Sequence, residues 1–341
     1  MLLPLKYTSG DLGRANGLTI LAGDIGATKT NLALYRVVNK QLMEISKMKF
    51  ITRQFPEPAM MLKEVLKGWS KPDRVCIGVP GPVINGKAML TNLNWEIDEQ
   101  LLAKEIGLNN PCLVNDLEAM AYGLALLPET DCVVVQKGIP GQAGNAAIIA
   151  PGTGLGEAGL YNDGSVYHPF ATEGGHCDFA PRTKLDIELL NHLQEQFGHV
   201  SWERLICGPG IFNIYKFFRD VKSINEPDWL NGLLEKADLP AVISSNVKAS
   251  ELCYKTMEYF IRYLAYESAN LVLKLKAIGG LFIGGGIAPQ ILELFEVFRF
   301  NNSFCQSGRL NYVLKNVPVK VIKNTEAPLL GAAYFVMHQQ L

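Results

Sequence analysis

The chain has 341 residues, of which 48% are hydrophobic and 19% are charged, a composition typical of a folded globular protein. The formal net charge is −1 at pH 7, so no strong field attracts nucleic acid or an anionic membrane. No apolar run reaches the roughly 18 residues of a membrane span. The N-terminus also lacks the basic start and apolar region of a signal peptide. We therefore expect a cytoplasmic protein that binds neither membrane nor nucleic acid.

The seven cysteines are odd in number and widely spaced. They form no CxxC pair, so neither a zinc ribbon nor a redox dithiol is indicated. Most have apolar neighbours, which favours a role as small core residues.

The first elements follow the order strand, strand, strand, helix, strand. Hydrophobic patterning predicts strands at 18–22, 31–38 and 42–51, a helix from Met61 to Trp69, and a buried strand at 74–79. In a Rossmann or P-loop unit, a glycine-rich turn leads from a strand into a helix. Here the turn Gly23–Thr28 joins two strands, and Thr28 precedes Lys29 where a Walker A motif has glycine. Both of those nucleotide folds are therefore excluded.

A second strand–turn–strand unit follows later, with the turn Gly152–Gly156 between strands at 145–150 and 157–161. Glycine lets the backbone approach an anion, and the exposed amides can then bind phosphate oxygens. Thr28 and Thr153 add hydroxyl donors. Either turn alone is best explained as an ordinary hairpin, but two in matching contexts indicate a nucleotide clamp in two related halves.

A third glycine run spans 279–286 and leads towards a helix expected over 289–298. The start of that helix can bind a nucleoside or its phosphates; a tight strand–helix connection is the alternative. Further helices are expected over 186–196 and 250–277, which completes an α/β composition.

Five polar residues follow predicted strand ends or stand near turns: Asn115, Asp116, Glu173, His176 and Glu203. Several of them have a purely structural explanation. Asn115 with Glu118 fits a capping box, Ser201 is a suitable N-cap for a helix whose first turn holds Glu203, and a lone histidine is often a core or surface group.

Seven segments, taken in order, resemble the bacterial glucokinase family within the actin, Hsp70 and sugar-kinase superfamily. They are Gly23–Thr28, Leu113–Leu117, Gly152–Gly156, Glu173–Pro181, Gly198–Arg204, Cys207–Gly210 and Ile283–Ile287. Each motif is modest, but the ordered set covers the chain from about Leu21 to its end and is highly specific.

This resemblance implies two RNase H-like α/β domains of the actin/hexokinase type flanking a cleft. We expect a flexible extension over 1–19, a small domain from 20–126 plus 324–341, and a large domain from 127–323. The implied reaction is ATP-dependent phosphorylation of D-glucose at the 6-hydroxyl by a homodimer.

The resemblance also assigns roles to residues of this chain. Asp116 is implied to be the general base, and Asn92, Asn115, Glu173, His176 and Glu203 to contact the sugar. ATP is implied to bind Gly23, Asp24, Ile25, Gly26, Ala27, Thr28, Gly152, Thr153, Gly154 and Gly285. A carboxylate beside a phosphate needs a cation between them, so Asp24 is a candidate contact for the Mg²⁺ of MgATP.

Two departures from related proteins bear on the site. Many family members have Gly-Gly-Thr-Asn where this chain has Gly26-Ala27-Thr28-Lys29, and Ala27 disfavours a positive φ. Glu173, His176, Cys177 and Asp178 are potential metal ligands, but the chain lacks the CxCGxxGC loop of ROK-type kinases and repressors. We therefore expect no zinc.

Three rivals remain open at the level of sequence. The chain could phosphorylate another hexose. It could be a sugar-sensing regulator without catalysis, although about 20 residues before the first strand are too few for a helix-turn-helix domain. It could be an actin-like or Hsp70-like ATPase, which the sugar-binding set argues against.

Overall fold

The computed structural model describes residues 2–5, 15–108, 110–235 and 238–338. The chain forms two compact units of mixed α/β structure. The first contains Met1–Asp131, Ala158–Thr172 and Asn324–Leu341, and the second contains Cys132–Glu157 and Glu173–Lys323. Among the described residues, no helix is long and apolar enough to cross a membrane.

The main sheet of the first unit has the strand order β3-β2-β1-β4-β8. β1 pairs antiparallel with β2 and parallel with β4, so the chain makes a hairpin and then crosses over through a helix. A smaller antiparallel sheet, β5-β6-β7, follows β4 and had no counterpart in the sequence predictions. The strands are β1 (Thr19–Ile25), β2 (Lys29–Val38), β3 (Gln41–Ile51), β4 (Arg74–Val79), β5 (Val83–Ile84), β6 (Lys87–Leu90), β7 (Trp95–Asp98), β8 (Cys112–Asn115) and β12 (Tyr167–Thr172).

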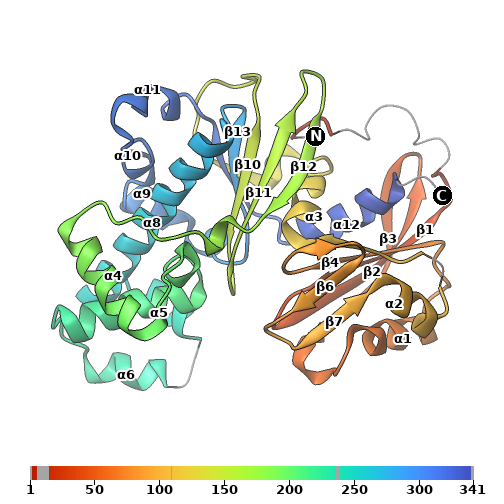
Figure 1. The fold of residues 1–341 in the computed structure, drawn as a ribbon, viewed down its shortest axis with the longest axis horizontal. Coiled ribbons are helices and arrows are strands. Elements are labelled where there is room, and N and C mark those ends of the chain that lie inside the picture. The colour runs from red at the N-terminus through yellow and green to blue at the C-terminus, as the bar shows by residue number, and fades with distance from the viewer. Residues whose placement is uncertain (1, 6–14, 109, 236–237, 339–341) are drawn as a thin grey trace. The chain divides into compact units, whose positions relative to one another are not determined.

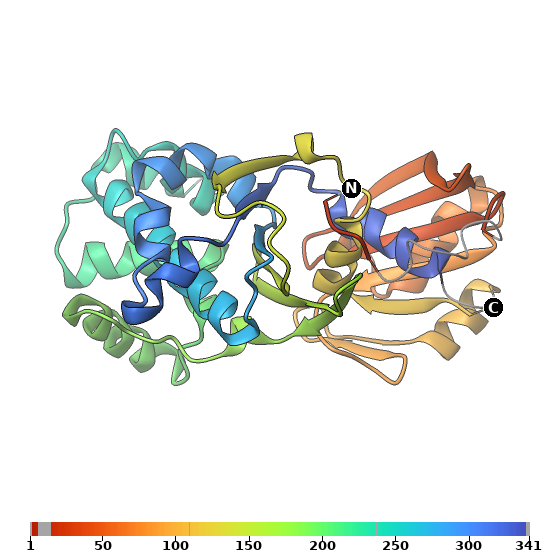
Figure 2. The same cartoon turned by 90° about the horizontal axis from the view of Figure 1, so that it is seen from above.

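Helices cover both faces of this sheet. They are α1 (Pro58–Gly68), α2 (Glu99–Ile106), α3 (Asp116–Gly123) and α12 (Ala327–Met337). α1 begins with Pro58 and buries Met61, Leu62 and Val65, one helical face, in a core shared with the strands. The C-terminal helix α12, drawn blue, lies against the red and orange strands β1 and β4 in both views (Figures 1 and 2).

The helices α3 and α12 approach each other backbone to backbone. A Cβ on Gly331 would collide with the Ala119 carbonyl, and a Cβ on Gly123 would collide with the Ala327 carbonyl. Both glycines are therefore needed for this close packing, which fixes α3 against the sheet.

The second unit contains a sheet in which β11, β10, β13, β14 and β9 are neighbours in that order (Figure 1). β10, β13 and β14 are parallel, and β9 is antiparallel to β14. The strands are β9 (Cys132–Gln136), β10 (Ala146–Pro151), β11 (Leu155–Asn162), β13 (Gly280–Ile283) and β14 (Val319–Ile322), with β11 leaving the second unit after Glu157.

One large apolar core joins this sheet to its helices. The helix α8 (Glu251–Leu275) supplies a long buried face that includes Met257, Phe260, Ile261 and Leu264. The other helices are α4 (Lys184–Phe197), α5 (Gly208–Lys216), α6 (Asp228–Leu234), α7 (Leu239–Ser245), α9 (Leu292–Val297), α10 (Phe300–Phe304) and α11 (Asn311–Leu314). The helix expected over 289–298 is instead a 3-10 turn, Ala288–Ile291, followed by the short α9.

The segment expected to be a flexible extension is packed where the structure describes it. Leu5 is fully buried and forms a β-bridge with Tyr167, and the Tyr167 amide donates to the Pro4 carbonyl at 2.8 Å. The rest of that expectation, at residues 1 and 6–14, lies outside the described residues.

Candidate functional site

The first glycine turn is a tight hairpin between β1 and β2. Gly23, Asp24 and Ile25 belong to β1, so only Gly26, Ala27 and Thr28 form the turn itself. The Gly26 amide donates to the Lys29 carbonyl at 2.9 Å, and Thr52 Oγ1 donates to the Gly26 carbonyl at 2.7 Å. The turn is therefore stabilised by its own backbone hydrogen bond and by the side chain of Thr52, the residue that follows β3.

Ala27 fits this hairpin without strain. It does not adopt a positive φ, so the methyl group that departs from the usual glycine meets no backbone penalty here. Thr28 and Lys29 are exposed at the tip of the hairpin. The turn therefore presents backbone that can bind an anion through its amides, with a lysine beside it.

Asp24 is the acidic residue nearest this turn. It is half-buried at the end of β1, and Asn31 Nδ2 donates to its Oδ2 at 3.4 Å. Burial raises the pKa of Asp24 to about 6, partly offset by the Asn31 bond. Because this carboxylate is costly to ionise in the free protein, a nearby cation would stabilise its ionised form.

Asn115 is the last residue of β8, and Asp116 is the first residue of α3. Asn115 Oδ1 caps α3 by accepting from the amides of Leu117 and Glu118 at 3.0 and 3.1 Å, which confirms its predicted capping role. Its Nδ2 donates to the Gly81 carbonyl at 3.0 Å. Asp116 Oδ1 accepts from the Leu117 amide at 2.9 Å, which fixes one carboxylate oxygen.

Asn92 lies elsewhere in the first unit, exposed on the turn between β6 and β7. Its role as a sugar contact stays a prediction.

The second glycine turn follows β10 in the second unit, and two other segments bind it. The Gly208 amide at the start of α5 donates to the Gly152 carbonyl at 2.9 Å. The Gly284 amide donates to the Ile149 carbonyl at 2.8 Å. Gly285 has a φ of 79°, and a Cβ there would collide with the Pro151 carbonyl. The structure thus brings Gly152–Gly154 and Gly285 together.

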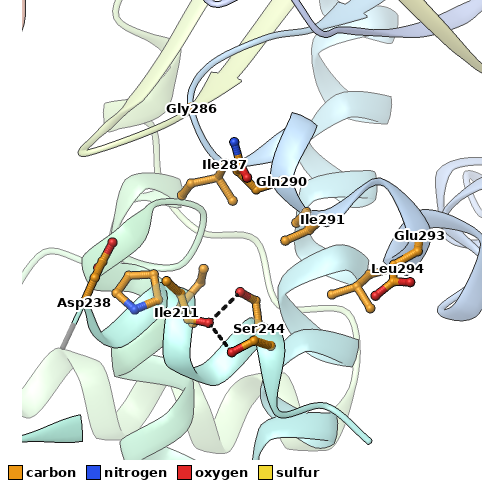
Figure 3. Close-up of a pocket in the computed structure, with 12 residues that line it drawn as sticks. Ile211, Asp238, Ser244, Gly286, Ile287, Gln290, Ile291, Glu293 and Leu294 are labelled. Atoms are coloured by element: carbon orange, nitrogen blue, oxygen red, sulfur yellow. Dashed lines mark hydrogen bonds between the residues drawn. The ribbon is translucent and has the colours of Figure 1, made fainter. Parts of the chain in front are cut away.

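A cavity of about 640 Å³ opens beside Gly286 (Figure 3). Ile287, Ile291 and Leu294 on one side and Ile211 from α5 on another give it apolar walls (Figure 3). Polar side chains contribute comparably to the lining: Asp238, Ser244, Ser245, Gln290 and Glu293. Apolar walls with a few polar groups suit a flat ring with polar edges. The sequence analysis missed α7, which supplies part of this lining.

Of the predicted sugar contacts, His176 ends the 3-10 turn Gly174–His176, and Glu173 directly precedes this turn. The following residues pair with the segment before Glu203, because the Trp202 amide donates to the Cys177 carbonyl at 3.0 Å and Phe179 with Val200 at 2.9 Å. This pairing brings the turn and Glu203 together, as the sequence hypothesis required.

Glu203 lies on a 3-10 turn, Trp202–Arg204, and not in a longer helix. Ser201 stands at the N-cap position of this turn, as predicted, but its side chain makes no capping hydrogen bond. Ser201 is buried, and its backbone forms a β-bridge with Asp178. Glu203 Oε2 instead accepts from the Leu155 amide at 3.0 Å, so it is bound to the second glycine turn.

The charges of these side chains act on one another. The pKa of Glu173 is raised, first by partial burial and also by the like charge of Glu203, while His176 lowers it. Carboxylates and an imidazole within mutual range can accept from and donate to several hydroxyls of one ligand.

Glu157 is a buried acid beside this turn that the sequence analysis read only as part of a strand. It is 1% exposed on β11, and burial raises its pKa to about 8, with Glu267 adding to the rise and Lys274 opposing it. The sequence pattern that could have indicated a buried acid here is a single glutamate followed by the apolar run Ala-Gly-Leu.

Comparisons with known proteins match this description over nearly the whole chain. A family model described as Glucokinase matches residues 21–339. A curated glucokinase of Trichormus variabilis is 39% identical over 333 residues, which is 92% of this chain and 97% of that protein.

Two solved structures extend the comparison. The crystal structure of a glucokinase from an Antarctic psychrotroph has a TM-score of 0.78 and 31% identity, and covers 94% of this chain and 99% of its own. A ROK family glucokinase from Streptomyces griseus, solved with glucose and AMPPNP, has a TM-score of 0.64 at 18% identity, covering 94% and 100%. The latter shows a shared fold, and the predicted α/β fold class of the sugar kinases is confirmed.

Proposed function

The chain belongs to the glucokinase family, and from that membership we propose that it transfers the γ-phosphoryl group of ATP to the 6-hydroxyl of D-glucose. The observation that carries this proposal is the convergence of Glu173, His176 and Glu203 beside the second glycine turn. A hydroxyl-binding set next to a phosphate-binding turn is what a sugar kinase requires and a simple ATPase does not.

In the proposed reaction, Asp116 is the general base. The Leu117 amide donates to its Oδ1. The carboxylate is therefore already oriented when it binds a hydroxyl, and it loses little further conformational freedom on binding. The carboxylate accepts the proton of the 6-hydroxyl as that oxygen attacks the γ-phosphorus. The bond between the γ-phosphorus and the β,γ-bridging oxygen breaks, and ADP leaves with its electron pair. Asn115, capped onto α3, supports this position, and Asn92 is proposed as a more distant sugar contact.

Glu173, His176 and Glu203 are proposed to hold the sugar ring. Acceptors and donors in a fixed pattern bind most tightly a substrate whose hydroxyls match them. A sugar that lacks one of these hydroxyls leaves a buried polar group of the site unpaired. This is the physical basis on which D-glucose would be preferred over another hexose.

For ATP, we propose that the two glycine turns bind the phosphates and that the cavity beside Gly286 binds the base. Its apolar walls would contact the ring faces, and the polar groups of its lining would bind the ring nitrogens. Lys29, exposed beside the first turn, adds positive charge for the phosphates.

Magnesium fits this donor set only as an ion carried by the nucleotide. The described residues contain no group of three or more His, Cys, Asp or Glu side chains that could hold a metal. Asp24 would contribute a single carboxylate, with phosphate oxygens and water as the other ligands. When bound, Mg²⁺ neutralises phosphate charge. We further propose a cytoplasmic location and a homodimer, as the family resemblance implies.

The deciding assay measures ADP release by the full chain with MgATP, with and without D-glucose. We expect turnover that depends on the sugar and yields glucose 6-phosphate, identified by mass spectrometry. Hexose-independent hydrolysis would indicate an ATPase, and binding of both ligands without turnover would indicate a regulator. A panel of mannose, glucosamine and fructose under the same conditions tests the choice of hexose.

A further inference from the structure

The carboxylate of Glu203 lies directly against the second glycine turn. Its Oε2 accepts from the Leu155 amide at 3.0 Å. A Cβ on Gly154 would lie only 2.5 Å from the same oxygen and 3.4 Å from the carboxyl carbon of Glu203. Gly154 does not have a positive φ, so the contact with this carboxylate, and not the backbone conformation, disfavours a side chain at position 154.

Backbone hydrogen bonds fix both partners of this contact. The Gly152 amide donates to the Gly154 carbonyl at 2.8 Å and closes the turn, and the Gly208 amide donates to the Gly152 carbonyl at 2.9 Å. Cys207 Sγ donates to the Glu203 carbonyl at 2.8 Å. The segment that carries Glu203 and α5, which follows it, are therefore both attached to the turn.

The hydrogen bonds of the turn show which of its donors can bind a phosphate. The Gly152 amide donates to the Gly154 carbonyl, and the Leu155 amide donates to Glu203. Among the described residues, the amides of Thr153 and Gly154 have no hydrogen-bond partner, and Thr153 is exposed. Successive backbone amides of this kind can bind an anion. A phosphate would therefore contact the two residues directly before the amide that Glu203 binds.

We propose that Glu203 is a positioning residue for ATP as well as a sugar contact: one carboxylate oxygen holds the second glycine turn in its phosphate-binding form, and the other accepts from the sugar. This inference rests on the proposed function, which assigns the sugar to Glu203 and a phosphate to the turn. The Leu155 amide uses Oε2, and Oε1 has no hydrogen-bond partner among the described residues, so the two contacts do not compete. Glu203 acts on ATP only through the turn.

The shared carboxylate gives the coupling a direction. A sugar hydroxyl bound to Oε1 restricts the Glu203 side chain and keeps Oε2 on the Leu155 amide. A phosphate bound to the turn restricts the same contact from the other side. Each ligand therefore orders a contact that supports the other, and coupling of this kind is reciprocal. We expect an effect of at least about fivefold on each affinity, the lower end of the usual range for coupled sites.

The first test changes the phosphate-binding turn and measures the sugar. In Gly154→Ala the added methyl group displaces the Glu203 carboxylate, which is the end of a flexible side chain, so the fold should remain intact. We expect the Kd for glucose, measured by calorimetry without nucleotide, to rise at least about fivefold. Circular dichroism checks that the variant is folded. Equal glucose affinity in the wild-type and Gly154→Ala chains overturns the proposal.

Gly152→Ala is the matched control in the same turn. A Cβ on Gly152 meets only the Gly154 carbonyl, at 3.9 Å, so the substitution leaves the Glu203 carboxylate in place. The Kd for glucose without nucleotide should therefore match that of the wild-type chain. A rise equal to that of Gly154→Ala would mean that any change in the turn weakens sugar binding, which contradicts the specific role of Glu203.

The second test changes the sugar contact and measures the nucleotide, and it stands even if Gly154→Ala does not fold. Glu203→Gln and Glu203→Ala both remove the charge, but only glutamine can still accept from the Leu155 amide. We expect Glu203→Ala to bind a non-hydrolysable ATP analogue with Mg²⁺, without glucose, at least about fivefold more weakly than Glu203→Gln. In steady-state kinetics, Glu203→Gln should raise the KM for glucose and not the KM for ATP. Equal affinities of the two variants for the analogue contradict the proposal.

These measurements also separate this proposal from the proposed function. A wild-type chain that binds no glucose refutes the proposed function. A wild-type chain that binds and phosphorylates glucose, but whose Gly154 and Glu203 variants show none of the expected differences, refutes only the positioning role of Glu203.

Discussion

Asp116 accepts a hydrogen bond from the Leu117 amide and is the proposed general base, so a conservative change can test that proposal. An asparagine at 116 can still accept from the Leu117 amide, so the α3 junction should remain intact. We expect Asp116→Asn to lower kcat by about 10²–10⁴-fold, the usual contribution of a general base, with a small change in the KM for glucose.

The matched control is Glu118→Gln, which neutralises the next acid on the same helix. Glu118 is half-buried, and burial raises its pKa, but the proposed reaction gives it no role. Steady-state kinetics should show near wild-type kcat for this variant. An equal loss in both variants would mean that α3, and not the Asp116 carboxylate, is what the assay reports.

Asp24 illustrates a conflict between stability and binding. Its folded pKa of about 6 lies above the ordinary 3.8, so the folded chain holds a proton that the unfolded chain releases between those values. The stability contributed by the protonated form is therefore complete below pH 3.8 and is lost as the pH rises to about 6. Asp24→Asn should raise the unfolding temperature at pH 7.5 but not at pH 4, while raising the KM for MgATP. A lower unfolding temperature at pH 7.5 would contradict this account.

At the scale of elements, Gly285 fixes the third glycine segment onto the second glycine turn. Its φ of 79° and its contact with the Pro151 carbonyl both exclude a side chain. We expect Gly285→Ala to cost at least about 1–3 kcal/mol of stability and to raise the KM for MgATP. Gly286→Ala is the control for stability, since a Cβ at Gly286 meets nothing within 4 Å. Chemical denaturation compares the two, and equal midpoints would refute the steric argument.

The contact between α3 and α12 makes a second prediction at this scale. Gly331→Ala places a methyl group against the Ala119 carbonyl, and overpacking of this kind typically costs about 1–3 kcal/mol. Gly68→Ala, at the end of α1 with nothing within 4 Å, should leave stability unchanged or raise it by up to about 1 kcal/mol. Because α3 carries Asp116, the Gly331→Ala variant should also lose kcat before it unfolds, which kinetics at low temperature can measure.

For the whole molecule, the proposed function predicts which segments of the chain each ligand should protect from hydrogen exchange. We expect hydrogen exchange to slow with glucose at 152–157, 173–177 and 201–204. A non-hydrolysable ATP analogue should slow exchange at 24–30, 238–245 and 284–291. Bound ligand lowers the frequency of local opening where its contacts lie. Protection confined to other segments would displace the proposed site.

The local elements could be predicted because they depend on short-range patterning. The strand at 74–79, the hairpin at Gly26–Thr28 and the Asn115 cap follow from hydrophobic periodicity, turn chemistry and side-chain competition for helix amides. The ordered motifs also identified the family, since together they constrain the chain far more than any one alone.

Other features depended on partners distant in the chain, which no local pattern contains. Ser201 stands at the predicted N-cap position, but its missing side-chain cap and its backbone bridge to Asp178 are known only from the fold. The sequence leaves open whether the backbone at Ala27 is strained, and only the folded hairpin shows that its φ is not positive. Glu157 appears in the sequence as one acid in a strand, yet its burial beside Gly174 and its opposition to Glu267 exist only after folding.

By itself, the sequence determined the family, the strand–turn–strand units and the identity of the polar residues proposed for catalysis. The tertiary structure decided which of those residues meet, which glycines are sterically required, and where a buried charge becomes costly. The physical reason is that propensity and periodicity act within a few residues, whereas desolvation and close packing depend on what the fold brings against each side chain.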